Sequence, residues 1–294
     1  HYLTRVLSNP SMICDFVLPE IIYRDIVEKA LAEDLGSGGD ITSGRLIQQE
    51  IEISAEIVAR QQGVLAGSKV ADLAFEIVDS GLFIDRKCFD GQVLSPGTTV
   101  MVIVGRASSI LTAERTALNF LSHLSGVATA TNEMVSAVAD TGAKICCTRK
   151  TTPGLRALEK YAVRVGGGVN HRYSLDGGVL IKDNHISICG GVSRVFEEIG
   201  DLGPDIAVEI EVDTLDQLRE ALKCGARSIL LDNMDNATLR EAVEMCKGQA
   251  SLEASGNVTL DSVGAIASTG VDYISSGWIT HSSPALDFGL DLAT

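Results

Sequence analysis

The chain is poor in aromatic residues and in positive charge, and it has no long apolar run. Aromatic side chains make up 4% of its 294 residues, too few for the base-stacking surfaces of single-strand binders. A net charge of −15 argues against a protein that coats the phosphates of a duplex. No stretch approaches the roughly 18 uninterrupted apolar residues of a membrane-spanning helix. We therefore expect no nucleic-acid partner and no membrane partner.

Paired cysteine motifs are also missing. The seven cysteines are an odd number, and no CxxC occurs. This pattern favours reduced, buried thiols over a disulfide framework or a zinc site. The start of the chain has no basic segment followed by an apolar one, which a secretory leader would have. We therefore expect a cytoplasmic protein.

Positive charge is concentrated in one block of the chain. Residues 144–185 contain eight Lys or Arg against three Asp or Glu, whereas the other residues contain 16 against 36. The basic residues alternate with glycines and apolar runs, so the block is not a disordered tail. A cationic block inside an acidic chain predicts a site for a small anion with several charges.

The N-terminal part mixes helical and strand patterns, and the later part repeats one unit. In the N-terminal part, the patterns predict helices over 18–35 and 111–124, and strand segments at 52–59, 63–66 and 92–104. From residue 144 onward, apolar runs begin near Ile145, Val179, Ile206, Ser228, Ser251 and Val271. The last four are spaced by 22, 23 and 20 residues, with helical segments such as 214–223 and 237–247 between later runs. This repeat predicts a parallel sheet, and the absence of GxGxxG after the first strand favours a β/α barrel over a dinucleotide fold.

Polar residues stand at the ends of these predicted strands, where a barrel places its active site. They include Thr148–Lys150, Lys182–His185, Glu209, Glu211, Asp213, Asp232–Asn233, Ser255–Asn257 and Ser275–Gly277. Period-2 spacing puts the three acids of the 209–213 run on one face, and the cost of burying unpaired acids favours a function for Glu211. His185 fits a structural role equally well. For Arg156, Lys160 and Arg164, helical spacing agrees with a solvent-exposed helix face as well as with a functional role.

The residue types at these ends suit two kinds of substrate. Arginine pairs with carboxylates through two hydrogen bonds, and lysine offers a compact charge for phosphate. Glu211 and Asp232 are ligands of the type that Mg²⁺ prefers. The Ser-Gly turns expose backbone N–H groups for a phosphate, and the glycines at 166–168 form either a flexible turn or a close approach to a ligand. Together they predict an anionic substrate beside a magnesium-bound, phosphorylated one.

Read together, these segments resemble the quinolinate phosphoribosyltransferase family over nearly the whole chain. The motifs that carry the resemblance are Ala32–Gly36, Gly39–Thr42, Glu114–Asn119, Leu124–Thr129, Thr148–Thr151, Pro153–Arg156, Gly166–Arg172, Lys182–His185, Glu209–Asp213, Leu231–Met234, Glu253–Gly256 and Ser276–Gly277. The resemblance implies an α/β protein with an N-terminal α/β sandwich domain over 1–116, completed by 283–294, and an open, seven-stranded β/α barrel over 117–282. It also implies a homodimer in which the sandwich domain of one subunit covers the barrel of the other.

The resemblance further implies a reaction and a role for each site residue. Quinolinate and phosphoribosyl pyrophosphate would give nicotinate mononucleotide, pyrophosphate and CO₂, with Mg²⁺ as cofactor. Catalytic residues would be Lys150, Glu211 and Asp232, the two acids also holding the metal, partly through water and substrate. Quinolinate would be held by Arg149, His171, Arg172, Lys182 and Arg115 from the partner subunit. The 5′-phosphate would be bound by Ser255, Gly256, Ser276 and Gly277.

Three other interpretations of the residues stay open. A related transferase could use nicotinate, although the number of cationic residues favours a dicarboxylate. A barrel lyase could form a Schiff base on Lys182 or Lys150. A catalytically silent relative could bind a phosphorylated metabolite only. Release of CO₂, borohydride trapping and turnover would separate them.

Overall fold

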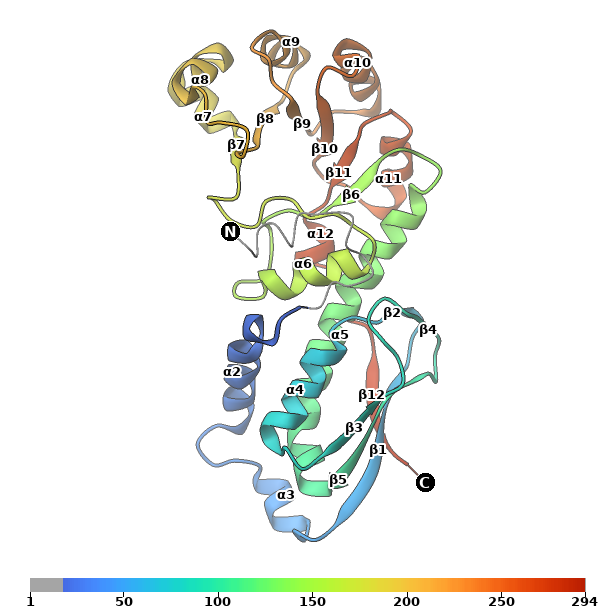
Figure 1. Ribbon diagram of the computed structural model, residues 1–294. Helices are drawn as coiled ribbons and strands as arrows, with labels where there is room; N and C mark the ends of the chain where they lie inside the picture. Colours follow the sequence, from blue (N-terminus) through green and yellow to red (C-terminus); the bar gives the residue numbers. More distant parts are fainter. Residues whose placement is uncertain (1–17, 294) are drawn as a thin grey trace. The chain divides into compact units, whose positions relative to one another are not determined.

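The computed structural model describes residues 18–293, which form two compact units (Figure 1). The first, here called the sandwich unit, comprises 18–132, 152–167 and 283–293. The second, the barrel unit, comprises 133–151 and 168–282. The N-terminal segment expected to lack a leader, and the predicted start of the first domain, lie outside the described residues.

The sandwich unit is built on an antiparallel sheet with strand order β12-β1-β5-β3. Its strands are β1 (Glu52–Ala59), β3 (Phe83–Arg86), β5 (Thr99–Arg106) and β12 (Phe288–Leu292), with a separate pair β2 (Gly63–Val64) and β4 (Val93–Leu94). Its helical segments are η1 (Glu20–Ile22), α2 (Arg24–Leu35), α3 (Ile41–Leu46), α4 (Ser68–Val78), most of α5 (Ala107–Ala137), and α6 (Arg156–Val165). The strand predicted over 52–59 is confirmed to the residue.

Helix α4 shows why the unit holds together. Its buried side chains include Val70, Leu73 and Ala74, none more than 2% exposed, and they occupy one face at helical spacing. The helix begins where the Asp90 carboxylate accepts hydrogen bonds from the N–H groups of Gly67 and Ser68, at 2.8 and 3.0 Å. A carboxylate at a helix N-terminus satisfies donors that no helical carbonyl can reach.

The barrel unit contains a parallel sheet of six strands in the order β6-β11-β10-β9-β8-β7. These are β6 (Lys144–Cys146), β7 (Val179–Ile181), β8 (Val208–Val212), β9 (Ser228–Asp232), β10 (Ser251–Ser255) and β11 (Tyr273–Ser275). The helices are α7 (Asp183–Cys189), α8 (Val192–Ile199), α9 (Leu215–Lys223), α10 (Asn236–Cys246), α11 (Leu260–Ala267) and α12 (Trp278–His281). All six strands follow the runs seen in the sequence, and the α/β class is confirmed.

The sheet of the barrel unit is open. Within the described residues its edge strands β6 and β7 are not paired with each other. One further parallel bridge joins Cys146 to Val169, outside the named strands. The sheet therefore has six named strands and this single bridge, where the resemblance implied seven strands. Val169 follows three consecutive glycines, which weaken an extended strand.

The boundary between the two units falls within α5, at 132 and 133, and α6 belongs to the sandwich unit. The domain limits expected from the resemblance, at 116/117 and 282/283, stay a prediction. No helix among the described residues is long and apolar enough to cross a membrane.

Candidate active site

Two arginines from separate segments of the barrel unit lie close together. Arg149 follows β6, and Arg172 lies in the loop before β7. Burial lowers the pKa of Arg172 from its usual value, and the positive charge of Arg149 lowers it further, while Glu209 acts in the opposite direction. The Nη1 of Arg172 donates to the Gly178 carbonyl at 2.8 Å, and its buried Nε has no hydrogen-bond partner in the described part of the chain. Two adjacent guanidinium groups with a spare donor suit a carboxylate ligand.

Neighbouring strands place a lysine against an acid. Lys182 follows β7, and its ammonium donates to the Glu211 carboxylate on β8 at 3.1 Å. The lysine side chain is 49% exposed and that of Glu211 13% exposed. His185 accepts the Lys182 backbone N–H through Nδ1 at 2.9 Å, at the start of α7. This contact favours the structural interpretation of His185.

The end of β9 packs against the turn after β10. Asn233 adopts a left-handed backbone with φ of 52°, and its amide donates to the Asp232 carboxylate at 2.8 Å. Gly256 has φ of 105°, and a Cβ added there would lie 2.1 Å from Asn233 Oδ1. Only glycine fits this contact. The Ser255-Gly256 turn is thus held directly beside Asp232.

A second turn is held beside Lys150. The Ser276 N–H donates to the Cys146 carbonyl at 3.0 Å. A Cβ added to Gly277 would lie 2.8 Å from Lys150 Cδ, and the Thr280 hydroxyl donates to the Lys150 carbonyl at 2.7 Å. The predicted phosphate turn at 276–277 and the predicted catalytic lysine are therefore neighbours.

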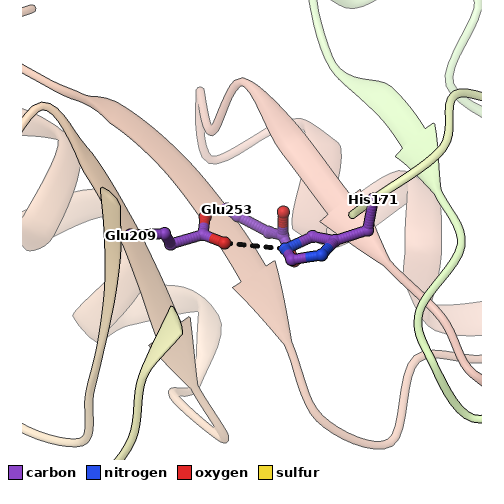
Figure 2. Close-up of side chains that lie close together, drawn as sticks. All are labelled: His171, Glu209 and Glu253. Atoms are coloured by element: carbon purple, nitrogen blue, oxygen red, sulfur yellow. Dashed lines mark hydrogen bonds and ion pairs between the residues drawn. The ribbon is translucent and has the colours of Figure 1, made fainter. Parts of the chain in front are cut away.

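Sequence reasoning missed a cluster of His171, Glu209 and Glu253, which Figure 2 shows in close-up. His171 Nε2 lies 2.7 Å from Glu209 Oε2, and the ligand atoms of all three residues lie within 4.8 Å of one another. Burial raises the pKa of Glu253, as does the charge of Glu209, while His171 and the Ser275 hydroxyl lower it. Glu209 and Glu253 stand at inward positions of β8 and β10, and this strand periodicity was the one available signal.

Some predicted residues lie elsewhere. Arg115 is exposed on α5, in the sandwich unit. The solvated-face interpretation of α6 is wrong, because Lys160 is fully buried and Arg164 is 9% exposed. Gly166 serves packing, since an added Cβ would lie 2.4 Å from the Ala128 carbonyl of α5.

The sandwich unit also contains a cavity of about 190 Å³ that the sequence did not reveal. It is lined by Ala30, Glu33, Asp34, Thr116, Asn119, Phe120, His123 and Leu155. None of these residues was predicted to bind a substrate. His123 at its wall pairs with the buried Glu159 at 2.9 Å.

Two domains of one protein family match the chain. Residues 40–125 match the N-terminal domain of quinolinate phosphoribosyl transferase, and residues 127–291 match its C-terminal domain.

Curated relatives and a solved structure are similar over almost the full length. A probable nicotinate-nucleotide pyrophosphorylase (carboxylating) of Bacillus subtilis is 42% identical, covering 88% of this chain and 90% of the relative. A mitochondrial quinolinate phosphoribosyltransferase (decarboxylating) of Nicotiana glauca is 40% identical, covering 94% and 84%. The nicotinate-nucleotide pyrophosphorylase structure from Francisella tularensis superposes with a TM-score of 0.91 and 38% identity, covering 97% of this chain and 100% of that one.

Proposed function

We propose that the strand ends of the barrel unit bind quinolinate beside phosphoribosyl pyrophosphate, because this chain belongs to the quinolinate phosphoribosyltransferase family. The chain is an enzyme of the pentosyltransferase class. It transfers a phosphoribosyl group to quinolinate with loss of CO₂, in the de novo synthesis of NAD. The single observation that most supports the assignment of residues is the 3.1 Å contact between Lys182 and Glu211, which brings a predicted quinolinate-binding lysine beside a predicted metal-binding acid.

The cationic wall orients the dicarboxylate. Arg149 and Arg172 bind its carboxylates, with Lys182, His171 and the Arg115 of a second subunit completing the wall. Fixing both carboxylates aims the ring nitrogen at the ribose C1, and this restriction of motion is itself a large part of the rate gain. The buried Nε of Arg172 supplies a donor that the described part of the protein leaves to a ligand.

The acidic wall faces the sugar donor. Glu211 and Asp232 lie in the last two residues of strands β8 and β9, and they offer the hard oxygen ligands that Mg²⁺ accepts in small number beside water and substrate oxygens. The donor set therefore fits the expected metal, which when bound offsets charge on the departing pyrophosphate. Lys150 adds a positive charge on the same side, and the turns at Ser255-Gly256 and Ser276-Gly277 bind the 5′-phosphate through backbone N–H groups.

Bond breaking at C1 gives an oxocarbenium-like transition state, which a nearby carboxylate stabilises. Attack by the ring nitrogen makes that nitrogen positive. The C2–carboxylate bond then breaks, its electron pair stays on C2 next to the positive nitrogen, and a proton adds there. No protein nucleophile takes part. The Schiff-base alternative on Lys182 or Lys150 is not favoured, because the chain belongs to a phosphoribosyltransferase family and the Lys182 ammonium donates to Glu211.

The assembly and the location of the protein belong to the same proposal. A homodimer would bring Arg115 of one subunit to the barrel of the other. The six cysteines in the described part of the chain are free thiols, which supports a reducing compartment such as the cytoplasm.

An assay of the purified chain tests the function. With phosphoribosyl pyrophosphate and Mg²⁺, quinolinate should be consumed with release of one CO₂ per nucleotide formed. Nicotinate in place of quinolinate is the control for the alternative substrate. Nucleotide formation from nicotinate at an equal rate, without CO₂, would contradict the proposal.

A further inference from the structure

A part-buried chain of hydrogen bonds joins the loop that carries His171 to strands β8, β9 and β10. His171 pairs with Glu209 Oε2 at 2.7 Å, and the other oxygen, Oε1, accepts from the Ser228 hydroxyl at 3.0 Å. The Ser251 hydroxyl in turn lies 3.4 Å from that of Ser228. Both oxygens of the Glu209 carboxylate are therefore held by neighbours, which fixes the orientation of the carboxylate inside the barrel.

This fixed carboxylate also fixes the histidine. An ionised carboxylate only accepts hydrogen bonds, so the proton of the His171 contact lies on Nε2. The two ring nitrogens of imidazole point in different directions, and the contact through Nε2 leaves Nδ1 directed away from Glu209. A carboxylate that hydrogen-bonds one ring nitrogen in this way orients a histidine and sets its tautomer, as it does for histidines in many metal sites.

The second acid of the cluster is arranged differently. Glu253 is 6% exposed, and both its burial and the nearby Glu209 favour the neutral carboxyl. A neutral Glu253 lowers the negative charge that the cluster presents to a dianionic substrate. The two glutamates thus differ in their surroundings, although both lie within reach of the same imidazole.

We propose that Glu209 is a positioning residue for quinolinate: it holds His171 through Nε2, so that the substrate meets an imidazole of fixed plane and tautomer. This inference rests on the proposed function, since it takes His171 as part of the quinolinate wall. A divalent cation held by the same three side chains is the competing use of the cluster.

Steady-state kinetics of three variants test the proposal. Glu209→Ala removes the hydrogen bond to His171, and we expect the KM for quinolinate to rise at least roughly tenfold, the scale of a charge-assisted hydrogen bond. The KM for phosphoribosyl pyrophosphate should change less than about twofold, because Glu209 does not face that substrate in the proposal. Glu209→Gln should recover part of the loss, because its amide oxygen still accepts from Nε2–H.

Glu253→Gln is the matched control, since an amide imitates a neutral carboxyl in shape. Its KM for quinolinate should stay within about threefold of that of the wild type, as expected for a swap of similar size. Equal rises in both KM values for Glu209→Ala, or an equal quinolinate defect in Glu253→Gln, would contradict the positioning role. So would a tightly bound Zn²⁺ in the wild type, found by metal analysis and lost in Glu209→Ala.

Failure of this inference and failure of the proposed function give different results. A wild-type enzyme that neither binds quinolinate in calorimetry nor converts it removes the proposed function, and the inference with it. A wild type that converts quinolinate while Glu209→Ala matches it in KM removes the inference alone.

Discussion

Asp72 is a buried carboxyl whose charge is poorly matched by its surroundings. It lies on α4, and Arg86 on β3 donates to its Oδ2 at 2.6 Å, but its buried Oδ1 has no hydrogen-bond partner in the described part of the chain. Burial raises its pKa from 3.8 to about 6, although Arg86 opposes the shift. The folded protein therefore retains a proton that the unfolded chain releases near pH 3.8.

The pKa of Asp72 predicts a pH dependence of stability. Because the folded pKa is raised, the contribution is fully present below about pH 4 and is lost as the pH rises through about 6. Asp72→Asn removes this loss, so its unfolding free energy relative to the wild type should increase by about 2 kcal/mol between pH 4.5 and 7. Urea unfolding of the variant and the wild type at both pH values measures this difference in unfolding free energy. Asp85→Asn, a half-exposed site on β3, controls for the removed charge, and parallel curves for Asp72→Asn and the wild type would refute the argument.

Arg149 should act on one substrate more than on the other. Arg149→Ala removes a guanidinium next to Arg172, and we expect quinolinate binding to weaken by at least roughly tenfold, while phosphoribosyl pyrophosphate binding changes little. Calorimetry with each ligand provides the measurement. Arg219→Ala on α9, where the side chain is 51% exposed, controls for loss of one positive charge. Equal weakening of both ligands would show that Arg149 is not part of a quinolinate wall.

At the residue scale, sequence analysis identified charged side chains that the fold brings together. It missed the side chains that hold them in place. Lys182 and Glu211 come from the ends of neighbouring strands, whose convergence follows from the barrel alone, whereas Arg172 approaches Arg149 from a loop. The His171–Glu209 contact joins a loop to a strand interior. No local pattern specifies where a loop histidine will reach, so this contact could not be predicted.

The helix termini are where local sequence decided structure most directly. Thr214 begins α9 with both bonds of a capping box: its hydroxyl accepts from the Gln217 N–H at 3.2 Å, and the Gln217 side chain accepts from the Thr214 N–H. The box was predicted from residue types three positions apart, and it is confirmed. The break at Tyr23 between η1 and α2, by contrast, interrupts an unbroken helical pattern.

The capping box gives a prediction at this scale. Thr214→Ala leaves helical N–H groups unsatisfied and should lower the unfolding free energy by about 1 kcal/mol. Thr214→Ser keeps the hydroxyl and should lose only a few tenths of that amount. Urea unfolding at constant pH compares the two, and an equal loss in both would mean that the methyl group, rather than the hydroxyl, stabilises α9.

At the scale of the whole molecule, the proposed dimer has a testable consequence. If Arg115 completes the site of a partner, Arg115→Ala and Asp232→Ala each inactivate the homodimer but damage different parts of a shared site. Unfolding and refolding the two variants together should restore about one quarter of wild-type activity, since random pairing gives half heterodimers with one intact site each. Either variant refolded alone is the control. No recovery in mixtures whose subunits demonstrably exchange would argue against a shared site.

The division into units was only partly visible in the sequence. The change from mixed elements to a βα repeat near residue 144 marks the barrel strands correctly. The repeat does not reveal that α6, inside the cationic block, belongs to the sandwich unit. Its placement depends on contacts such as that of Gly166 with Ala128, which join residues far apart in the chain.

Strand β12 has a consequence for how the protein is made. It pairs with β1 from Ala55↔Leu292 to Ala59↔Phe288, so the first strand of the sandwich sheet gains this neighbour only after the barrel unit has been translated. Throughout synthesis of the barrel, the edge of β1 therefore offers open hydrogen-bonding groups to any other nascent chain. The sheet that is begun first is thus completed only after the strands of the second unit have been made.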